Sequence, residues 1–444
     1  MSELGVEEGS LSGRRAAEAA RLESPAYANY VLGVLFLVYL VNFADRHLIS
    51  VLIEPMKRDL GATDTQMGLL TGMAFAAFYV LFGLPVAMWA DRGSRRSILA
   101  LGIAVWSLLT AATGLGRSYL HVLLARIGVG VGESTAGAPV HSLISDYFPA
   151  ERRATALAIY TAGAQIGAML GIMLGGWLSD LYGWRITFLL IGAPGLALAL
   201  LVRLTVAEPR RGRFDGAVTT RPAALGETLR FLAARPSYLC IILAIASLIS
   251  ASYGASSWHP TLLRRVHGMS GTEIGVWLGL VANGGAMLGG ISLALLADRL
   301  GRRDKRWYLI LPAVATLLSL PLTFVFPLWP DRETAIFFLA PWSFLAGSIA
   351  GPMYAMVQSV ARPDMRALAA AILMFVMNLL GMGIGPTFVG MASDALTPRF
   401  GDEAIRYAVL LVAPAQLLGA GLCLLGARHL PRDIERATSP LPAA

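Results

Sequence analysis

The stretch Ala87-Met-Trp-Ala-Asp-Arg-Gly-Ser-Arg-Arg96 recurs as Ala294-Leu-Leu-Ala-Asp-Arg-Leu-Gly-Arg-Arg303 in the second half of this chain of 444 residues. The two aspartates lie 207 residues apart, and each copy ends a long apolar run with a short basic segment. Residues 61–68 align at the same offset with residues 268–275. A repeat of this length predicts a duplicated membrane protein in which a pathway runs between two related halves.

The composition predicts an all-α integral membrane protein. Hydrophobic residues make up 56% of the chain and charged residues 14%, whereas soluble domains carry about 25% charge. Apolar segments of about 20 residues, the length needed to cross a hydrocarbon core of roughly 30 Å, recur along the chain. We expect twelve transmembrane helices in two six-helix repeats, at residues 29–56, 66–90, 97–116, 120–146, 154–178, 185–206, 237–262, 272–297, 307–327, 334–360, 367–392 and 404–427.

The predicted domain order consists of two six-helix halves and three polar segments. Residues 27–206 and 237–428 form the halves, and residues 207–236 form a basic linker in which a short amphipathic helix is expected on the membrane surface. Residues 1–26 and 429–444 are polar tails, of which the first is expected to be disordered. The first apolar run is too long for the apolar region of a signal peptide.

The distribution of basic residues predicts the orientation in the membrane. The net charge is +8, and 25 of the 36 Lys and Arg residues fall on the side that holds the N-terminus, nine fall on the other side, and Arg46 and Arg126 fall within spans. The positive-inside rule therefore predicts a multi-pass protein of the cell inner (plasma) membrane with both termini in the cytoplasm. The positive charge is explained in this way and implies no nucleic-acid partner. Cys240 and Cys423 lie in apolar spans and are expected to pack rather than to form a disulfide or a metal site.

The repeated basic segment predicts a conformational gate. Acidic and basic side chains at a helix end can clamp neighbouring helix ends and release them when the halves move apart; the alternative is a topology signal without such a role. The segment resembles the loop between the second and third spans of the major facilitator superfamily, and this resemblance extends over nearly the whole chain. It implies gate roles for Asp91, Arg92, Arg95, Arg96, Asp298, Arg299 and Arg302.

Four charged residues fall inside spans of the first half. Asp45 and Arg46 are adjacent in the first span, and Arg126 and Glu133 lie seven residues apart on one face of the fourth. Charges at this depth are costly and need partners or a wet cavity. The corresponding positions of the second half are uncharged: Ser252, Tyr253, Ala340 and Gly347. Because the scaffold does not need the charges, we favour proton coupling and charge recognition over a passive buried ion-pair network.

Several segments together resemble the Spinster branch of the superfamily. They are residues 42–46, 54–61, 66–79, 83–86 and 128–133. Animal members of that branch export sphingosine phosphate and lysophospholipids, and the resemblance implies proton-linked roles for Asp45, Glu133, Arg46 and Arg126. Alanine- and arginine-rich usage and short loops suggest a bacterial homologue, whose substrate need not be the same lipid.

Two further features have simpler interpretations. Gly163, Gly167, Gly171 and Gly175 recur every four residues in the fifth span, which predicts close packing against another helix. His47 follows Arg46 and could relay protons, but a single histidine in a span is more often a hydrogen-bonded packing residue.

The sequence as a whole predicts a secondary active transporter that works by alternating access, is not an enzyme, and has no cofactor or metal. Substrate-binding candidates are Arg46 and Arg126 on a charged side of a central cavity and Tyr253, Tyr354 and Asn378 on a neutral side, although the last three could equally bond neighbouring helices. Such a cavity suits an amphiphile with a charged head, such as a lysolipid or a sphingoid base. The alternatives are a proton-linked carrier of a small organic anion or drug-like compound, and a non-transporting ligand sensor. We expect a monomer whose partners are substrate, protons and the bilayer.

Overall fold

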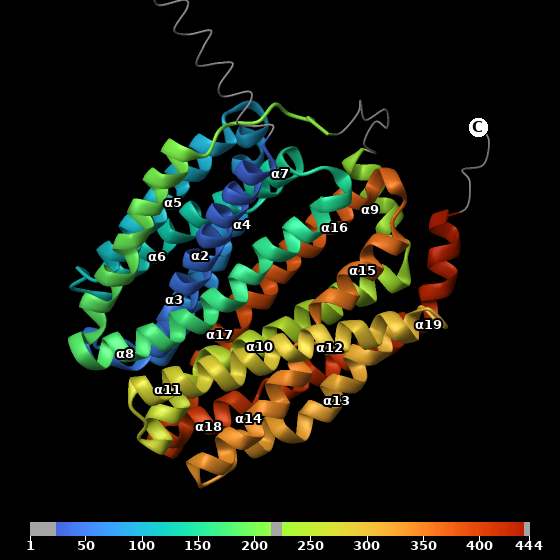
Figure 1. The fold of residues 1–444 in the computed structure, drawn as a ribbon. Coiled ribbons are helices and arrows are strands. Elements are labelled where there is room, and N and C mark those ends of the chain that lie inside the picture. Colours follow the sequence, from blue (N-terminus) through green and yellow to red (C-terminus); the bar gives the residue numbers. More distant parts are fainter. Residues whose placement is uncertain (1–23, 215–223, 439–444) are drawn as a thin grey trace, which may run out of the picture.

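The computed structural model describes residues 24–214 and 224–438, and every regular element in these ranges is helical (Figure 1). Nine helical stretches in the described ranges are long and apolar enough to cross a membrane. The stretches Ala150–Thr205 and Pro363–Ala437 each contain two spans, and the interrupted helix from Tyr119 to Tyr147 supplies another. The fold is therefore the expected all-α bundle of twelve spans in two six-helix repeats. The tail predicted at residues 1–26 lies almost wholly outside the described ranges.

The first half is built from seven α-helices and one short 3-10 turn. In chain order these are α2 (Pro25–Leu60), α3 (Asp64–Thr71), α4 (Met73–Arg92), α5 (Arg95–Thr113), α6 (Tyr119–Glu133), η1 (Ser134–Ala136), α7 (Ala138–Tyr147) and α8 (Ala150–Thr205). Helix α8 holds the fifth and sixth spans, which are separated at Gly183, where φ is 77°. Only glycine adopts such a backbone conformation readily, so this residue makes the reversal between the two spans.

The second half follows the linker helix α9 (Leu225–Ala233) and repeats the same order of spans. Its elements are α10 (Pro236–His267), α11 (Gly271–Trp277), η2 (Leu278–Asn283), α12 (Gly284–Gly301), α13 (Trp307–Leu328), α14 (Arg332–Ala346), α15 (Ala350–Val360), η3 (Pro363–Met365), α16 (Arg366–Val376), η4 (Met377–Met382), α17 (Gly383–Phe400), η5 (Gly401–Glu403), α18 (Ala404–Leu410) and α19 (Ala413–Thr438). Two of these, η2 and η4, are single π-helical segments inside the eighth and eleventh spans. Such segments insert an extra residue into a helix and are frequent at functional sites.

The internal repeat extends to the details of the helix ends. Helices α2 and α10 both end at a left-handed glycine, Gly61 (φ 62°) and Gly268 (φ 64°). The following helices α3 and α11 both begin with a capping box, formed by Thr63 with Gln66 and by Ser270 with Glu273. The aligned segments 61–68 and 268–275 are thus the same turn in the two halves.

The glycine ladder of the fifth span packs against α2. A Cβ added at Gly163, Gly167 or Gly171 would overlap successive carbonyl oxygens of α2, those of Phe36, Leu40 and Ala44. The packing interpretation of the ladder is confirmed.

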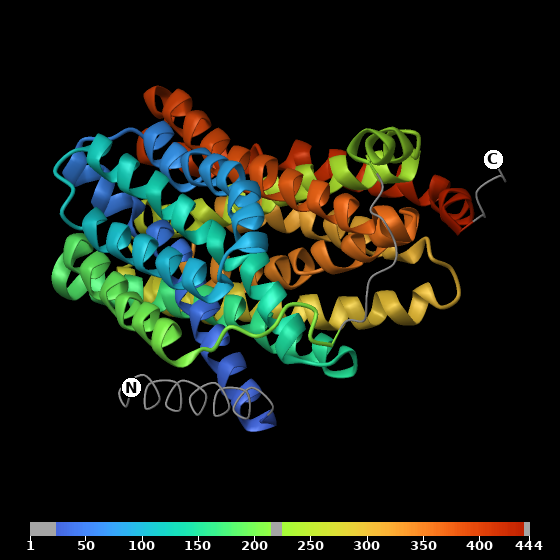
Figure 2. The same cartoon turned by 90° about the horizontal axis from the view of Figure 1, so that it is seen from above.

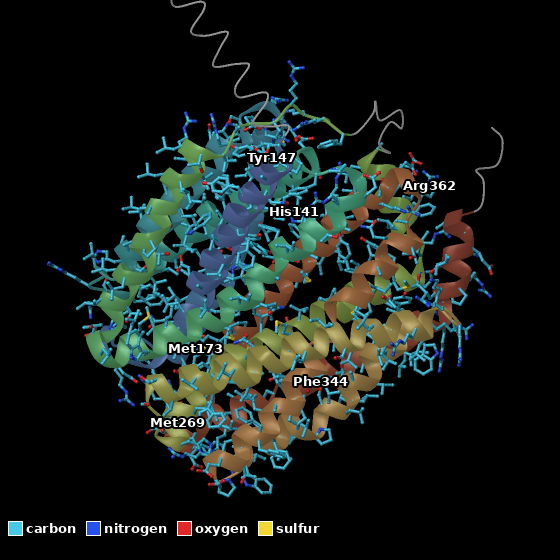
Figure 3. The ribbon with its side chains drawn as sticks, viewed as in Figure 1. His141, Tyr147, Met173, Met269, Phe344 and Arg362 are labelled. Carbon is cyan, nitrogen blue, oxygen red and sulfur yellow. The ribbon has the colours of Figure 1, made fainter. Side chains whose placement is uncertain are left out.

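The two halves lie side by side, with the first half in blue to green and the second in yellow to red (Figures 1 and 2). We call the end of the bundle that carries residue 24, the linker and residue 438 the termini end, and the end with the turns after α2 and α10 the far end. Figure 3 shows Met173 and Met269 near the far end and Tyr147 and Arg362 near the termini end. The halves meet closely at the far end, where a Cβ on Gly176 of α8 would overlap the Gly271 carbonyl oxygen of α11.

Candidate functional site

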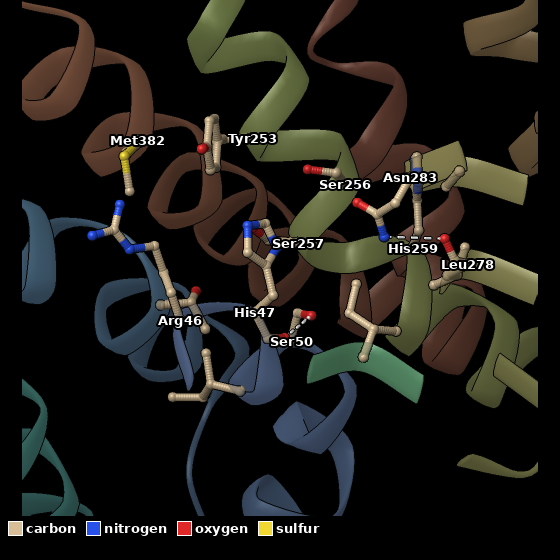
Figure 4. Close-up of a pocket in the computed structure, with 14 residues that line it drawn as sticks. Arg46, His47, Ser50, Tyr253, Ser256, Ser257, His259, Leu278, Asn283 and Met382 are labelled. Carbon is tan, nitrogen blue, oxygen red and sulfur yellow. Dashed lines mark hydrogen bonds between the residues drawn. The ribbon is translucent and has the colours of Figure 1, made fainter. Parts of the chain in front are cut away.

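A cavity lies between the two halves at mid-bundle, on the far-end side of Arg46 (Figure 4). About 700 Å³ of space between the atoms lies within its bounds, part of it open to solvent. Both halves line it: Arg46, His47, Ile49, Ser50, Thr71 and Ile172 from the first, and Tyr253, Ser256, Ser257, His259, Leu278, Ala282, Asn283 and Met382 from the second. The cavity therefore combines polar groups with apolar walls.

Arg46 forms a buried ion pair with Glu133 at the edge of this cavity. Its Nη2 lies 2.6 Å and its Nε 3.0 Å from Glu133 Oε2. The Arg46 side chain is 9% exposed and the Glu133 side chain is fully buried. The guanidinium carbon lies 4.9 Å from the centroid of the Phe75 ring and 5.1 Å from that of Tyr79, so aromatic faces add cation–π attraction. Helix α2 thus presents a paired cation to the cavity.

Asp45 has a different partner from its neighbour. Its buried carboxyl group accepts a hydrogen bond from the Thr110 hydroxyl of α5, and its Oδ1 has no partner among the described residues. Adjacent helix residues point about 100° apart, which is why Asp45 faces α5 while Arg46 faces α6 and the cavity. Thr110 was not among the residues predicted for the site, although a threonine in an apolar span was a visible signal.

Arg126 completes the cluster without an ion pair. In the described ranges its Nη2 donates to the Arg46 carbonyl oxygen at 3.4 Å, and its Nε has no partner. Its guanidinium carbon lies 4.6 Å from the centroid of the Phe75 ring. The structure therefore brings the four charged residues together, but it joins only Arg46 and Glu133 directly.

The neutral side of the predicted site is only partly where the sequence placed it. Tyr253 lines the cavity, as expected for a substrate-facing residue. Tyr354 and Asn378 are not among its lining residues; Tyr354 is 37% exposed and the Asn378 amide donates to the Met374 carbonyl oxygen at 2.8 Å. Further lining residues were not predicted from the sequence: Ser50, Thr71, Ser256, Ser257 and Asn283. A polar cluster in the far-end part of the seventh span was the signal for two of them, Ser256 and Ser257.

The basic segment predicted as a gate makes contacts other than those expected. Asp91 is exposed and makes no ion pair in the described structure, and Asp298 accepts a hydrogen bond from the Tyr308 hydroxyl at 2.8 Å rather than from an arginine. The buried cation is Arg95, which pairs with Asp146 of α7 and, at 2.7 Å, with Glu208 of the linker. Asp91 therefore does not hold the neighbouring arginines in this conformation, and the gate role of the segment stays a prediction. These ion pairs of Arg95 join only residues of the first half and the linker.

Glu208 is the acidic residue that connects the linker to the start of α5. It accepts hydrogen bonds from the Arg96 backbone N–H (2.9 Å), Arg95 Nε (2.7 Å) and the Ser94 hydroxyl (2.9 Å). Burial acts to raise the pKa of the Glu208 carboxyl group, but these hydrogen bonds outweigh burial and hold the pKa below its usual value. Glu208 thereby fixes the start of α5 to the linker.

The far end is closed by ion pairs between the halves. Asp64 at the start of α3 accepts from both terminal nitrogens of Arg265 in α10, at 2.6 and 2.7 Å, and from Lys57 Nζ at 2.7 Å. Arg265 Nε also contacts Glu54 Oε2 at 2.6 Å. In the described ranges, every ion pair that joins the two halves lies at this end.

Two aspartates at repeat-related positions reinforce this closure. Asp394 of α17 accepts hydrogen bonds from the first backbone N–H groups of α3, and Asp180 of α8 accepts from those of α11, at 2.6 to 3.0 Å. Each aspartate therefore caps a helix of the opposite half, where the N–H groups and the helix dipole favour a negative charge. Such bonds must break before the far end can open.

Comparison with known proteins finds one matching family and several relatives over most of the chain. The family model described as "Major Facilitator Superfamily" matches residues 35–386. An "MFS-type efflux pump" of Mycolicibacterium smegmatis is 34% identical, over 92% of this chain and 95% of its own length. "Protein spinster homolog 1" of Homo sapiens is 26% identical, over 93% and 83%, and the "Cis,cis-muconate transport protein" of Acinetobacter baylyi is 29% identical, over 70% and 75%.

A solved structure agrees with this fold over almost the whole chain. It is described as a bacterial homologue of the human lysosomal transporter Spinster in an inward-facing and unoccupied conformation. Its TM-score is 0.84 and its identity 30%, with 95% of this chain and 100% of that chain covered.

Proposed function

Because the chain belongs to the major facilitator superfamily and is of the Spinster type, it is a membrane transporter rather than an enzyme, and we propose that it is a proton-coupled carrier of an amphiphilic anion. The substrate would occupy the cavity between the halves. Movement of the halves would expose that cavity alternately to the two sides of the membrane.

The observation that carries the proposal is the arrangement of the four charges. The Arg46–Glu133 ion pair lies at the cavity edge, while Asp45 is buried one residue away without a cation in direct contact. A buried carboxyl group requires either a cation or a proton. If substrate binding draws Arg46 away from Glu133, that carboxylate needs a new partner, and a proton satisfies it. Substrate and proton binding are then linked through Arg46.

We further propose that the termini end is cytoplasmic, which makes this conformation inward-facing. Support comes from the excess of basic residues at that end and from the positive-inside rule. The ion pairs at the far end then form the outer gate. The comparable solved protein, also inward-facing by its description, is consistent with this assignment.

An amphiphilic substrate fits the mixed lining of the cavity. Arg46 can hold an anionic head, and Ile49, Ile172, Leu278 and Met382 offer apolar contact to a chain. A small organic anion is the second candidate, because the same arginine would bind a carboxylate and a relative is named for muconate transport. The relative named as an efflux pump is compatible with either candidate.

Flux measurements in proteoliposomes test coupling and substrate class together. Labelled lysophosphatidylglycerol, cis,cis-muconate and a cationic dye are offered with and without an imposed pH gradient. We expect gradient-driven accumulation of the lysolipid by the wild type. Asp45→Asn and Glu133→Gln should lose that accumulation by at least about tenfold, while Asp45→Asn retains substrate exchange without a gradient.

Asp402→Asn is the matched control, because Asp402 is an exposed acid of η5 far from the cavity. Accumulation that ignores the gradient in the wild type, or that survives in both cavity variants, contradicts proton coupling. Accumulation of muconate alone replaces the amphiphile with the small organic anion.

A further inference from the structure

The second-half wall of the cavity carries hydroxyl groups that form no hydrogen bond within the described protein. Tyr253, Ser256 and Ser257 line the cavity from α10, and no hydrogen bond of their hydroxyl groups occurs within the described ranges. Figure 4 shows the Arg46 guanidinium on one side of the pocket, Ser256 and Asn283 on the other, and the His47 ring between them. These hydroxyl groups are therefore available to a ligand.

The two serines differ from Ser50 and Ser247 in what their hydroxyl groups bond. A serine inside a helix commonly donates its hydroxyl proton to a carbonyl group about one turn earlier. Ser50 of α2 does so to the His47 carbonyl oxygen at 2.7 Å, and Ser247 of α10 to the Leu243 carbonyl oxygen at 2.9 Å. Ser256 and Ser257 make no such bond in the described structure. Because no bond to their own helix occupies these hydroxyl groups, they can bond a partner outside it.

Asn283 adds a fixed group to the same wall, and His47 adds one from the first half. The Asn283 amide nitrogen donates to the Leu278 carbonyl oxygen at 3.2 Å, within the π-helical segment η2. This bond fixes the side chain and leaves its amide oxygen without a donor among the described residues. The His47 ring stacks on Phe43 with centroids 6.1 Å apart, and its nitrogens make no hydrogen bond in the described ranges. Donors and acceptors of hydrogen bonds are therefore both present.

The charges around the cavity limit the charge of its ligand. Arg46 is the one arginine or lysine among the lining residues, and it is already paired with Glu133. With both acids ionised, Asp45 and Glu133 balance Arg46 and Arg126, so one bound negative charge is compensated when one acid takes up a proton. A second negative charge on the second-half wall would meet hydroxyl, amide and imidazole groups but no arginine or lysine.

From this arrangement we infer that the cavity selects a substrate with one negative charge and, beside it, uncharged hydroxyl or amide groups. Arg46 holds the anion, and Ser256, Ser257 and Asn283 hold the hydroxyl or amide groups. This inference rests on the proposed function, since it assumes that the transported substrate occupies this cavity. It singles out amphiphiles in which a phosphodiester or carboxylate adjoins a polyol or amide.

Two synthetic probes test the inference on the purified full-length protein. They are octyl phosphodiesters of equal charge, one esterified to glycerol and the other to methanol, so that they differ in the hydroxyl groups of the head. Binding is measured by titration calorimetry, and flux of both probes is measured in proteoliposomes. We expect the wild type to bind the glycerol diester about tenfold more tightly, the effect of one or two additional hydrogen bonds.

Ser256→Ala/Ser257→Ala should abolish this preference by lowering the affinity for the glycerol diester to that for the methyl diester. Ser247→Ala, on the same helix but bonded to its own backbone, should retain the preference. Binding of the methyl diester by the double variant also shows that this variant is folded. If the variant does not fold, the ratio of the wild-type affinities for the two diesters alone decides.

Equal affinities for the two probes in the wild type overturn the inference, as does a full preference in the double variant. If both diesters are transported without discrimination, the inference fails and the proposed function survives. If neither diester is bound or transported while muconate is, the proposed amphiphilic substrate fails and the inference fails with it.

Discussion

Asp45 and Arg46 are neighbours in α2, yet they contact different helices. Arg46 binds Glu133 of α6, whereas Asp45 accepts a hydrogen bond from Thr110 of α5. Because the Thr110 hydroxyl group can also accept a hydrogen bond, it can stabilise Asp45 in either protonation state. Thr110 therefore has a positioning role in the proposed proton step, although it does not line the cavity.

The Thr110→Val variant tests this role, because it removes the hydroxyl group and keeps the branched shape. We expect the pH profile of gradient-driven uptake to shift measurably and the maximal rate to fall by about threefold to tenfold, the effect of losing one hydrogen bond to a charged group. Uptake is measured from pH 5 to pH 8. Thr113→Val is the matched control, because Thr113 lies on the same helix and donates to the Leu109 carbonyl oxygen instead. Identical pH profiles for Thr110→Val and wild type would rule the role out.

At the residue scale, the sequence was informative where a charge stood alone in an apolar span. Arg46 and Glu133 carry such charges and are in contact in the structure. Asn378 could not be placed, because it lies in the π-helical segment η4, which changes the helix register by one residue and cannot be recognised from composition. Tyr354 lies in α15, outside that segment, and is exposed. Ser256 and Ser257 were missed because serine in a span has an ordinary role in bonding its own helix.

Among the helices, the start of α5 is fixed by the linker that follows α8. Glu208 joins them through three hydrogen bonds. The sequence correctly marked the basic segment but could not name its acidic partner, because Asp146 and Glu208 lie more than fifty residues away along the chain. Asp91 looked like the partner because it was near in sequence.

Glu208→Gln should change how stability depends on pH. The folded pKa of Glu208 is below the unfolded value of about 4.3. Its stabilising contribution is therefore fully present above that value and is lost as pH falls through the lower folded pKa. The melting temperature of the wild type, measured in detergent, should fall between pH 6 and pH 3.5 more steeply than that of Glu208→Gln. Glu403→Gln, at an exposed acid, should behave as the wild type. Equal slopes of melting temperature against pH for Glu208→Gln and wild type would contradict the proposed link between Glu208 and α5.

The crossing of α8 and α11 at the far end depends on Gly176. An added Cβ would overlap the Gly271 backbone of the opposite half, which no side-chain rotation can relieve. Gly176→Ala should therefore push the halves apart there, at a cost of about 1–3 kcal/mol in the stability of the closed far end. Spin labels at Arg117 and Asp402 should report a longer mean distance. Gly33→Ala, where a Cβ meets no atom within 4 Å, is the control, and unchanged distances in Gly176→Ala would contradict the account.

For the whole molecule, the duplication was the most reliable signal in the sequence. It predicted the twelve spans and the common order of the two halves, because apolar length and repeat offset are encoded locally. Which end is closed was not predictable, since that depends on contacts between Asp64 and Arg265, 201 residues apart. Asp180 and Asp394 lie 214 residues apart in the sequence, at equivalent places in the two halves, but their capping of opposite halves was not predictable.

The proposed orientation can be tested by labelling intact cells. In a background of Cys240→Ala and Cys423→Ala, single cysteines replace Arg117 or Asp402 at the far end, or Arg230 of α9 at the termini end. All three positions are exposed. An impermeant maleimide should label the first two in intact cells and the third only after permeabilisation. Labelling of Arg230→Cys in intact cells would reverse the orientation and make the conformation outward-facing.

The central claim is that substrate movement and proton movement are linked through the Arg46–Glu133 pair and Asp45. The most direct measurement is the lumenal pH of proteoliposomes that contain a pH-sensitive dye, with the membrane potential clamped and no initial pH gradient. Addition of the transported glycerol octyl phosphodiester to the outside should change the lumenal pH in the wild type. Asp45→Asn should abolish that change while it still exchanges labelled for unlabelled substrate. Wild-type substrate uptake with no change in lumenal pH would contradict the claim and leave the four charges as binding groups of a facilitator.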